Sequence, residues 1–279
     1  RIEVDGQLVR PPWTPHPHWD RDEVHEIYRE WRELADSYDP PRVFVAEAWV
    51  DEPDRLSRYI RHDELHTAFN FNYLVAPWRA PEMRKAIEET LAEHAAVGAP
   101  PTWVLSNHDV ARHVSRYARV EQPDRAFHLS GIADLPVDLA LGTRRARAAV
   151  LLTLSLPGGA YVYQGEELGL PEVEDLPDEV LQDPTWERSG HTDRGRDGSR
   201  VPIPWSGDSP PYGFGPGEET WLPQPGDWGR LTVSAETGDP SSMLELYRTA
   251  LRLRREHPAL GDGTLRLRDD LGVQVIAFD

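Results

Sequence analysis

Three acidic residues of this 279-residue chain lie at positions where carboxyl groups could do chemistry. Glu47 directly follows the apolar run Val43–Ala46, Asp109 follows the run that ends at Ser106, and Glu3 lies at the start of the sequence. Carboxyl groups can supply a proton, a nucleophile and a stabiliser of a positively charged transition state, which are the needs of glycoside cleavage. One acidic residue after a strand is usually a cap or a solvent-facing group, so it is the combination that carries weight.

The surrounding sequence alternates between helix and strand patterns. Helices are predicted over 20–38, 81–97, 144–155 and 241–256, and strands over 42–47, 67–71, 102–106 and 160–164. This alternation is typical of parallel βαβ units, and so of an α/β barrel or a doubly wound sheet. Glu47 and Asp109 are 62 residues apart, close to two units of roughly 30 residues. Because the carboxyl ends of barrel strands form the active-site face, both should lie on one rim.

Two segments depart from this alternation. Residues 165–239 are rich in Gly, Pro and Asp, carry four Trp and show no periodicity, and a loop of this length in a compact domain is usually functional. After Pro258, the runs 264–268 and 273–278 are separated by a turn and are typical of an antiparallel β module.

Composition excludes several classes of protein. The chain has 30 Lys and Arg against 48 Asp and Glu, a formal charge of −18 that would repel nucleic acid and anionic lipid. It has no Cys, which excludes disulfides, thiolate metal sites and cysteine nucleophiles. No apolar run is long enough to span a membrane and the first residues do not have the pattern of a signal peptide, so a cytoplasmic location is expected.

The sequence offers little for a metal or a phosphate. His16 and His18 would need a third ligand to hold zinc. Five other histidines fit solvated or capping positions: His25, His62, His66, His94 and His113. The acidic run 172–179 is expected to be a solvated loop, with a calcium site as the alternative. Gly158 and Gly159 are too few for a phosphate-binding loop.

Four motifs together resemble the α-amylase family, glycoside hydrolase family 13, and in particular its exo-acting α-glucosidase and oligo-1,6-glucosidase branch. They are Val45-Ala-Glu47-Ala-Trp49, Val104-Leu-Ser-Asn-His-Asp109, Tyr161-Val-Tyr-Gln-Gly-Glu-Glu-Leu168 and Arg196-Asp-Gly-Ser-Arg-Val-Pro-Ile-Pro-Trp205. The resemblance implies that Glu47 is the general acid and base and that Asp109 stabilises the transition state. It further implies substrate-binding roles for a set of polar residues, namely Arg1, Asn107, His108, Arg196 and Arg200.

The sequence also departs from that pattern. The family's nucleophile is an aspartate in an Arg-x-Asp segment on the fourth strand, and the candidate segment here, Arg1-Ile-Glu-Val4, has Glu3 in its place. The extra methylene moves the carboxylate oxygens by up to roughly 1.5 Å. The motifs of the family's first three strands are absent. We therefore expect a partial (β/α)8 barrel, about strands 4 to 8, over 1–258 with the long loop 165–239, and the beginning of an antiparallel C-terminal β domain over 259–279.

The predicted function is that of a retaining α-glucosidase that releases glucose from the non-reducing end of short α-glucosides. A chain of this extent is expected to be inactive alone, as a fragment of the full enzyme. Two alternatives stay open: a non-catalytic sugar-binding scaffold, and a transglycosylase of the trehalose synthase or sucrose isomerase type. The expected partner is an oligosaccharide resembling maltose or isomaltose, without nucleic acid or membrane. No cofactor or metal is implied, with calcium as an option in a full-length enzyme.

Overall fold

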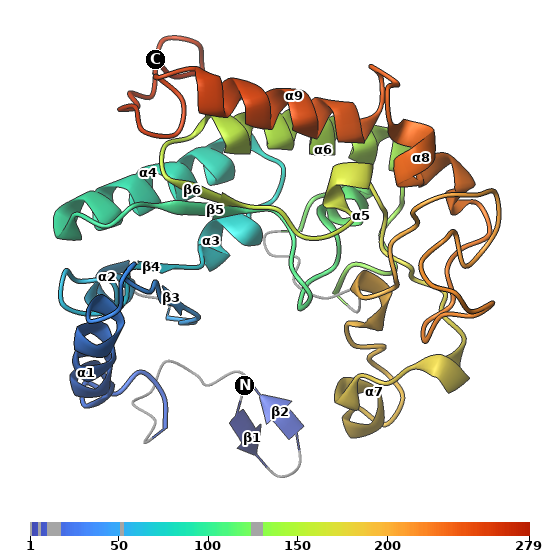
Figure 1. Ribbon diagram of the computed structural model, residues 1–279, viewed down its shortest axis with the longest axis horizontal. Coiled ribbons are helices and arrows are strands. Elements are labelled where there is room, and N and C mark those ends of the chain that lie inside the picture. Colours follow the sequence, from blue (N-terminus) through green and yellow to red (C-terminus); the bar gives the residue numbers. More distant parts are fainter. Residues whose placement is uncertain (1, 5–6, 10–17, 51–52, 124–130) are drawn as a thin grey trace.

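The structure is a computed structural model that describes the backbone of residues 2–4, 7–9, 18–50, 53–123 and 131–279, and the side chains of 18–50, 55–123 and 131–279. Figure 1 shows long helices packed along one side of short strands. The strands are β1 (Ile2–Val4), β2 (Gln7–Val9), β3 (Val45–Ala46), β4 (Thr67–Ala68), β5 (Thr102–Val104) and β6 (Gly159–Tyr161). The α-helices are α1 (Val24–Asp36), α2 (Pro53–Tyr59), α3 (Phe71–Leu74), α4 (Ala80–Val97), α5 (His113–Ala118), α6 (Leu139–Ser155), α7 (Pro184–Arg188), α8 (Val233–Glu236) and α9 (Met243–Glu256).

The strands from β3 to β6 run in one direction. β3 pairs parallel with β4, and β5 pairs parallel with β6. Two side-chain hydrogen bonds join β4 to the chain that enters β5: Thr67 donates to the carbonyl of Pro100, and Thr102 donates to that of Ala68. From the first of these bonds to the second, the residue numbers rise in both segments, as they do between parallel strands. The parallel βαβ units predicted from the sequence are therefore present, although each strand is only two or three residues long.

The first strand differs from expectation. The segment that contains Glu3 was predicted to be a parallel barrel strand, but β1 pairs antiparallel with β2, with Glu3 opposite Leu8. Only two residues of the sequence separate β1 from β2, and such a short connection can only join antiparallel neighbours. The parallel pairing expected for a fourth barrel strand is thus not seen in the described part of the chain.

The long helices follow the predicted periodicity, and their ends have clear physical causes. α4 ends at Gly98, whose φ of 70° is the left-handed conformation that glycine adopts without strain. α6 begins before the predicted residue 144 because the Asp138 side chain accepts a hydrogen bond from the backbone N–H of Leu141, an N-cap that extends the helix by a turn. α9 begins in the same way, with Ser242 accepting from the N–H of Glu245.

The main core lies between these helices and the strands. Trp103 of β5 and Tyr73 of α3 are fully buried and meet edge to face with ring centroids 5.1 Å apart. α5 and α6 pack closely at Gly142, where a Cβ would lie only 2.5 Å from the carbonyl oxygen of Val114. Figure 1 shows α9 lying along α6, so that α6 is covered on both sides.

The long loop of residues 165–239 is ordered around a core of its own. It contains α7, α8 and short 3-10 turns, and it buries Trp228, Tyr212 and Leu222. The other tryptophans of this loop are partly or largely exposed, with Trp205 and Trp221 about half exposed at 47% and 52%. The loop therefore folds on buried apolar contacts, although its sequence has no periodicity.

In the region of the predicted antiparallel module, 259–279, the structure has one isolated bridge. Leu267 and Phe278 form an antiparallel bridge, flanked by paired backbone hydrogen bonds between Arg266 and Asp279. Within 131–279 this bridge does not lengthen into a strand. Among the helices that the structure describes, none is both long and apolar enough to cross a membrane.

Candidate active site

The two carboxylates that the sequence places on one rim follow strands of the parallel set. Glu47 comes directly after β3, and Asp109 lies in the loop that follows β5. Because these strands run in the same direction, both residues leave the sheet at its carboxyl end, as predicted. Glu47 is exposed, and in the part of the chain with described side chains its carboxylate has no hydrogen bond or ion pair.

The loop of Asn107, His108 and Asp109 is shaped by its own side chains. Asn107 accepts a hydrogen bond from the backbone N–H of Asp109 at 2.8 Å through its side-chain oxygen, which closes a tight turn. The His108 ring lies beside it, with Nε2 3.6 Å from Oδ2 of Asp109, and its side chain is 64% exposed. Asn107 therefore acts as scaffold here, and His108 presents its imidazole to solvent next to the carboxylate.

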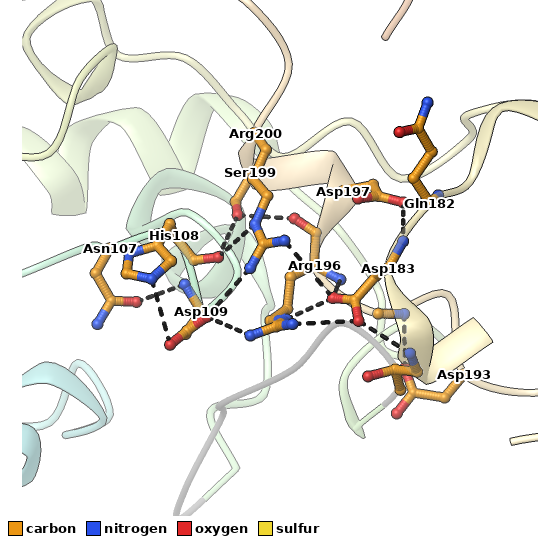
Figure 2. A network of polar contacts seen from close by, with 12 residues as sticks. Asn107, His108, Asp109, Gln182, Asp183, Asp193, Arg196, Asp197, Ser199 and Arg200 are labelled. Carbon is orange, nitrogen blue, oxygen red and sulfur yellow. Dashed lines mark hydrogen bonds and ion pairs between the residues drawn. The ribbon is translucent and has the colours of Figure 1, made fainter. Parts of the chain in front are cut away.

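Two arginines from a distant loop reach Asp109 (Figure 2). Arg196 donates from Nη1 to Oδ1 of Asp109 at 2.5 Å, and Arg200 donates from Nη2 to the same oxygen at 3.2 Å. Arg200 also donates from Nε to the carbonyl of His108 at 3.0 Å. The structure thus brings together five of the residues that the resemblance assigned to the site: Asn107, His108, Asp109, Arg196 and Arg200.

Asp183 is a member of this network that the sequence analysis did not identify. Its side chain is fully buried and accepts from the Arg196 backbone N–H at 3.0 Å, from Arg196 Nε, and from the N–H of Thr185 at 2.9 Å. Burial by itself would raise the pKa of Asp183, but the hydrogen bonds from Arg196 and Thr185 hold that pKa well below its usual range. Hydrogen bonding to Asp183 in turn raises the pKa of Arg196.

The loop that carries the two arginines is fixed by a second buried aspartate. Asp197 accepts the backbone N–H groups of Gln182 and Asp183 at 2.5 and 2.9 Å. These bonds tie the 3-10 turn Asp197–Ser199 to the residue that caps α7. The segment that bears Asp183 and the segment that bears Arg196 are therefore held as one unit (Figure 2).

A buried arginine connects the loop that bears Arg196 and Arg200 to the strands. Arg112, 1% exposed, donates to the carbonyl of Gln164 after β6 at 2.8 Å and to the carbonyl of Ser199 at 2.9 Å. Its guanidinium lies 5.1 Å from the centre of the Tyr163 ring, and the Tyr163 hydroxyl donates to the same Ser199 carbonyl. Arg112 thus joins the loop after β5, the end of β6 and the arginine-bearing loop.

Two expectations about polar residues near the site were wrong. His113 was expected at a solvated or capping position, but it is fully buried, where Nδ1 lies 2.8 Å from Ser106 Oγ, and burial lowers its pKa to about 3. Glu172 was expected in a solvated run, but it is buried and accepts the backbone N–H of Arg112 at 2.8 Å. In both cases a hydrogen bond compensates for part of the burial, from Ser106 seven residues away for His113 and from Arg112 sixty residues away for Glu172.

The remaining predicted residues cannot be placed in the site. The side chain of Glu3 and the whole of Arg1 lie outside the described residues. Among the side chains that the structure describes, no three His, Asp or Glu residues are grouped as metal ligands would be. The expectation of a nucleophile at position 3 thus stays a prediction, as does that of a calcium ion.

The arrangement around Asp109 suits a neutral, hydroxyl-rich ligand. A carboxylate, two guanidinium groups and an imidazole face one another with partly exposed edges, and they offer acceptors and donors within a few ångströms. Sugar hydroxyls both donate and accept hydrogen bonds, so they can pair with each of these groups. A carboxylate held in this way also stabilises positive charge that develops on a nearby sugar ring.

Comparisons with known proteins identify the family to which the chain is similar. Residues 14–263 match the catalytic domain of alpha-amylase. A probable alpha-glucosidase of Rhizobium meliloti is 35% identical over 210 residues, and an oligo-1,6-glucosidase of Parageobacillus thermoglucosidasius is 27% identical over 278 residues. These alignments cover 75% and 88% of this chain, and 34% and 46% of the respective relatives.

A solved structure of an alpha-glucosyl transfer enzyme is also similar. It is 32% identical, superposes with a TM-score of 0.75, and the match covers 92% of this chain and 44% of that chain. The chain therefore spans less than half the length of each protein with which it is compared here.

Proposed function

Because the chain belongs to the alpha-amylase catalytic-domain family, whose fold is a (β/α)8 barrel, we propose that it supplies catalytic residues for the cleavage of α-glucosidic bonds in short oligosaccharides. In this proposal it corresponds to about strands 4 to 8 of such a barrel, followed over 259–279 by the first part of a β module. The observation that carries the proposal is the convergence of Arg196 and Arg200 on Asp109, beyond the carboxyl end of β5.

The proposed reaction proceeds in two displacements with retention at the anomeric carbon. Glu47 donates a proton to the glycosidic oxygen as the aglycone departs, while a carboxylate attacks the anomeric carbon and forms a glucosyl ester. Glu47 then takes a proton from the acceptor that attacks this ester, and glucose is released when the acceptor is water. Asp109 stabilises the positive charge that develops on the ring, and Arg196, Arg200 and His108 bind its hydroxyl groups.

The attacking carboxylate is proposed to be Glu3, on sequence grounds alone. A glutamate here reaches further than an aspartate, and a displacement of about 1 Å in a reacting group can lower a rate about a hundredfold. The antiparallel pairing of β1 with β2 does not add support for this role.

A second candidate function differs only in the acceptor. The similarity to an alpha-glucosyl transfer enzyme favours transfer of glucose to another sugar in place of water. Both outcomes use the same glucosyl ester, so the residues around Asp109 serve both.

Product analysis tests these proposals. The protein at its natural length is incubated with maltose, isomaltose and soluble starch, and the products are separated by chromatography. Hydrolysis predicts glucose from the two disaccharides and almost none from starch, whereas transfer predicts new disaccharides or trisaccharides. Cleavage of starch into mixed maltodextrins would contradict the preference for short substrates, and no change in any substrate would contradict the catalytic proposal.

A further inference from the structure

Arg196 lies between two carboxylates, and the buried one contributes more of its hydrogen bonds. The Nη1 atom reaches Asp109, while Nε and Nη2 both point to Asp183, with Nη2 3.3 Å from its Oδ1. The backbone N–H of Arg196 donates to Asp183 as well. The side chain of Arg196 is 29% exposed and that of Asp183 is not exposed at all, so the contact with Asp183 is the protected end of this guanidinium.

An arginine has several long side-chain rotamers, and one held at a single carboxylate edge can swing away from it. Binding at a second edge, by a group that is itself immobile, removes most of this freedom. Asp183 is immobile because it is the N-cap of α7 and because Asp197 binds its backbone N–H. The guanidinium is thus oriented toward Asp109 before any ligand arrives.

We propose that Asp183 is a positioning residue, which holds the Arg196 guanidinium against Asp109 and so preforms the part of the site that binds the sugar. The role in sugar binding rests on the function proposed above. The orientation of Arg196 does not rest on it, because it concerns two residues of the chain itself.

The simpler reading is that Asp183 only caps α7. Two substitutions separate the readings. Asp183→Ser keeps a side-chain oxygen that can accept the Thr185 N–H, since serine is among the best N-caps, but it removes the acceptors of Arg196. Asp183→Asn keeps the shape but cannot satisfy all donors, because an amide group turned toward Arg196 would oppose N–H to N–H.

Asp193→Asn is the matched control. Asp193 lies in the same loop and accepts the backbone N–H of Gly195 at 3.0 Å, so the substitution makes the same change of charge near the same helix. Among the side chains that the structure describes, no guanidinium bonds to the Asp193 carboxylate. Thermal unfolding of all variants shows whether each is folded before other measurements are made.

The first readout is the Arg196 side chain itself. In a ¹⁵N-labelled protein, its Nε–H signal is assigned by its loss in Arg196→Lys, and its exchange with water is measured. We expect slow exchange in the wild type and in Asp193→Asn, and exchange at least about tenfold faster in Asp183→Ser and Asp183→Asn, as for loss of a charge-assisted hydrogen bond. Unchanged exchange in folded Asp183→Ser would overturn the proposal.

The second readout is binding of 1-deoxynojirimycin, a glucose-shaped amine, measured by calorimetry. We expect the dissociation constant to rise about tenfold to a hundredfold in both Asp183 variants and to stay within about twofold in Asp193→Asn. Faster exchange without weaker binding would overturn the role in the site. If the wild type does not bind the amine, the sugar-binding role of Asp183 and the proposed function are both contradicted, while the exchange experiment still decides whether Asp183 orients Arg196.

Discussion

Arg196 and Asp109 meet through a hydrogen bond of 2.5 Å although they are 87 residues apart in the sequence. Each belongs to a loop that is fixed by other residues: Asn107 shapes the loop of Asp109, and Asp183 holds Arg196. Because each loop is held by its own hydrogen bonds, the geometry of the contact between Arg196 and Asp109 is set before a sugar binds.

The first prediction concerns Asp109. Asp109→Asn removes the negative charge proposed to stabilise the oxocarbenium-like transition state, so kcat/KM for maltose should fall about 10²–10³-fold, mostly through kcat. Steady-state kinetics at several substrate concentrations measure the two parameters separately. Asp134→Asn, an exposed aspartate of another loop, is the control. A fall confined to KM would indicate a binding role without transition-state stabilisation.

The second prediction concerns proton transfer by Glu47. Glu47→Gln should lower kcat about 10²–10⁴-fold for maltose, whose leaving group needs a proton, and much less for p-nitrophenyl α-glucoside, whose phenolate departs unprotonated. Initial rates on both substrates check this, with exposed Glu33 of α1 changed to Gln as the control. Equal losses on the two substrates would argue for a structural role of Glu47.

The third prediction concerns the contact of α5 with α6. In Gly142→Ala, the added methyl would meet the Val114 carbonyl oxygen at 2.5 Å and the backbone of Ala118 at 2.8 Å. The unfolding free energy should fall by about 1–3 kcal/mol from overpacking, although alanine by itself favours a helix by up to about 1 kcal/mol.

Denaturant unfolding measures this change. Gly226→Ala is the matched control, because a methyl at Gly226 would meet open space, and its effect should stay within about 0.5 kcal/mol. A stabilised Gly142→Ala would show that the two helices can separate without cost.

The fourth prediction concerns pH. Burial raises the pKa of Glu166 to about 8. Among the described residues, one of its oxygens has only the Tyr247 hydroxyl as a side-chain partner, at 2.7 Å, and the other is buried without a partner. The folded protein therefore keeps this carboxyl protonated at pH values where the unfolded chain, near 4.5, has lost the proton. The stability that this proton provides is complete below about pH 4.5 and is lost as the pH rises toward 8.

Glu166→Gln removes this titration. Its unfolding free energy relative to the wild type should rise between pH 5 and pH 8.5, by an amount on the order of a few kcal/mol. Denaturant titrations at both pH values measure the difference, and Glu33→Gln should show almost none. A difference that stays constant with pH would mean that Glu166 is ionised in the folded protein.

The sequence predicted the helices better than the strands. Amphipathic spacing and end signals such as Gly98 are local, and the ends of α1, α4 and α9 lie within four residues of the predicted ranges. The strands are shorter than their apolar runs, because only two or three residues in each find a hydrogen-bonding neighbour. Strand length depends on partners elsewhere in the chain, which an apolar run does not reveal.

The sequence predicted those residues of the site that lie in short contiguous motifs. Asn107, His108, Asp109, Arg196 and Arg200 lie in two short motifs, and the structure brings those motifs together. Asp183 was missed because it is one aspartate in an aperiodic loop, 13 residues from Arg196, and its burial depends on the fold of that loop. The buried state of His113 was missed because it depends on how α5 packs against the segment after β5, where its partner Ser106 lies.

The bond from Arg112 to the carbonyl of Ser199 has a consequence for synthesis of the protein. The two residues are 87 positions apart, and at about 5–20 residues per second a ribosome needs about 4 to 17 s to reach the second after the first. During that interval the guanidinium lacks an acceptor that it has in the folded state. The loop after β5 should therefore stay open on the nascent chain, and close only after the arginine-bearing loop has been translated.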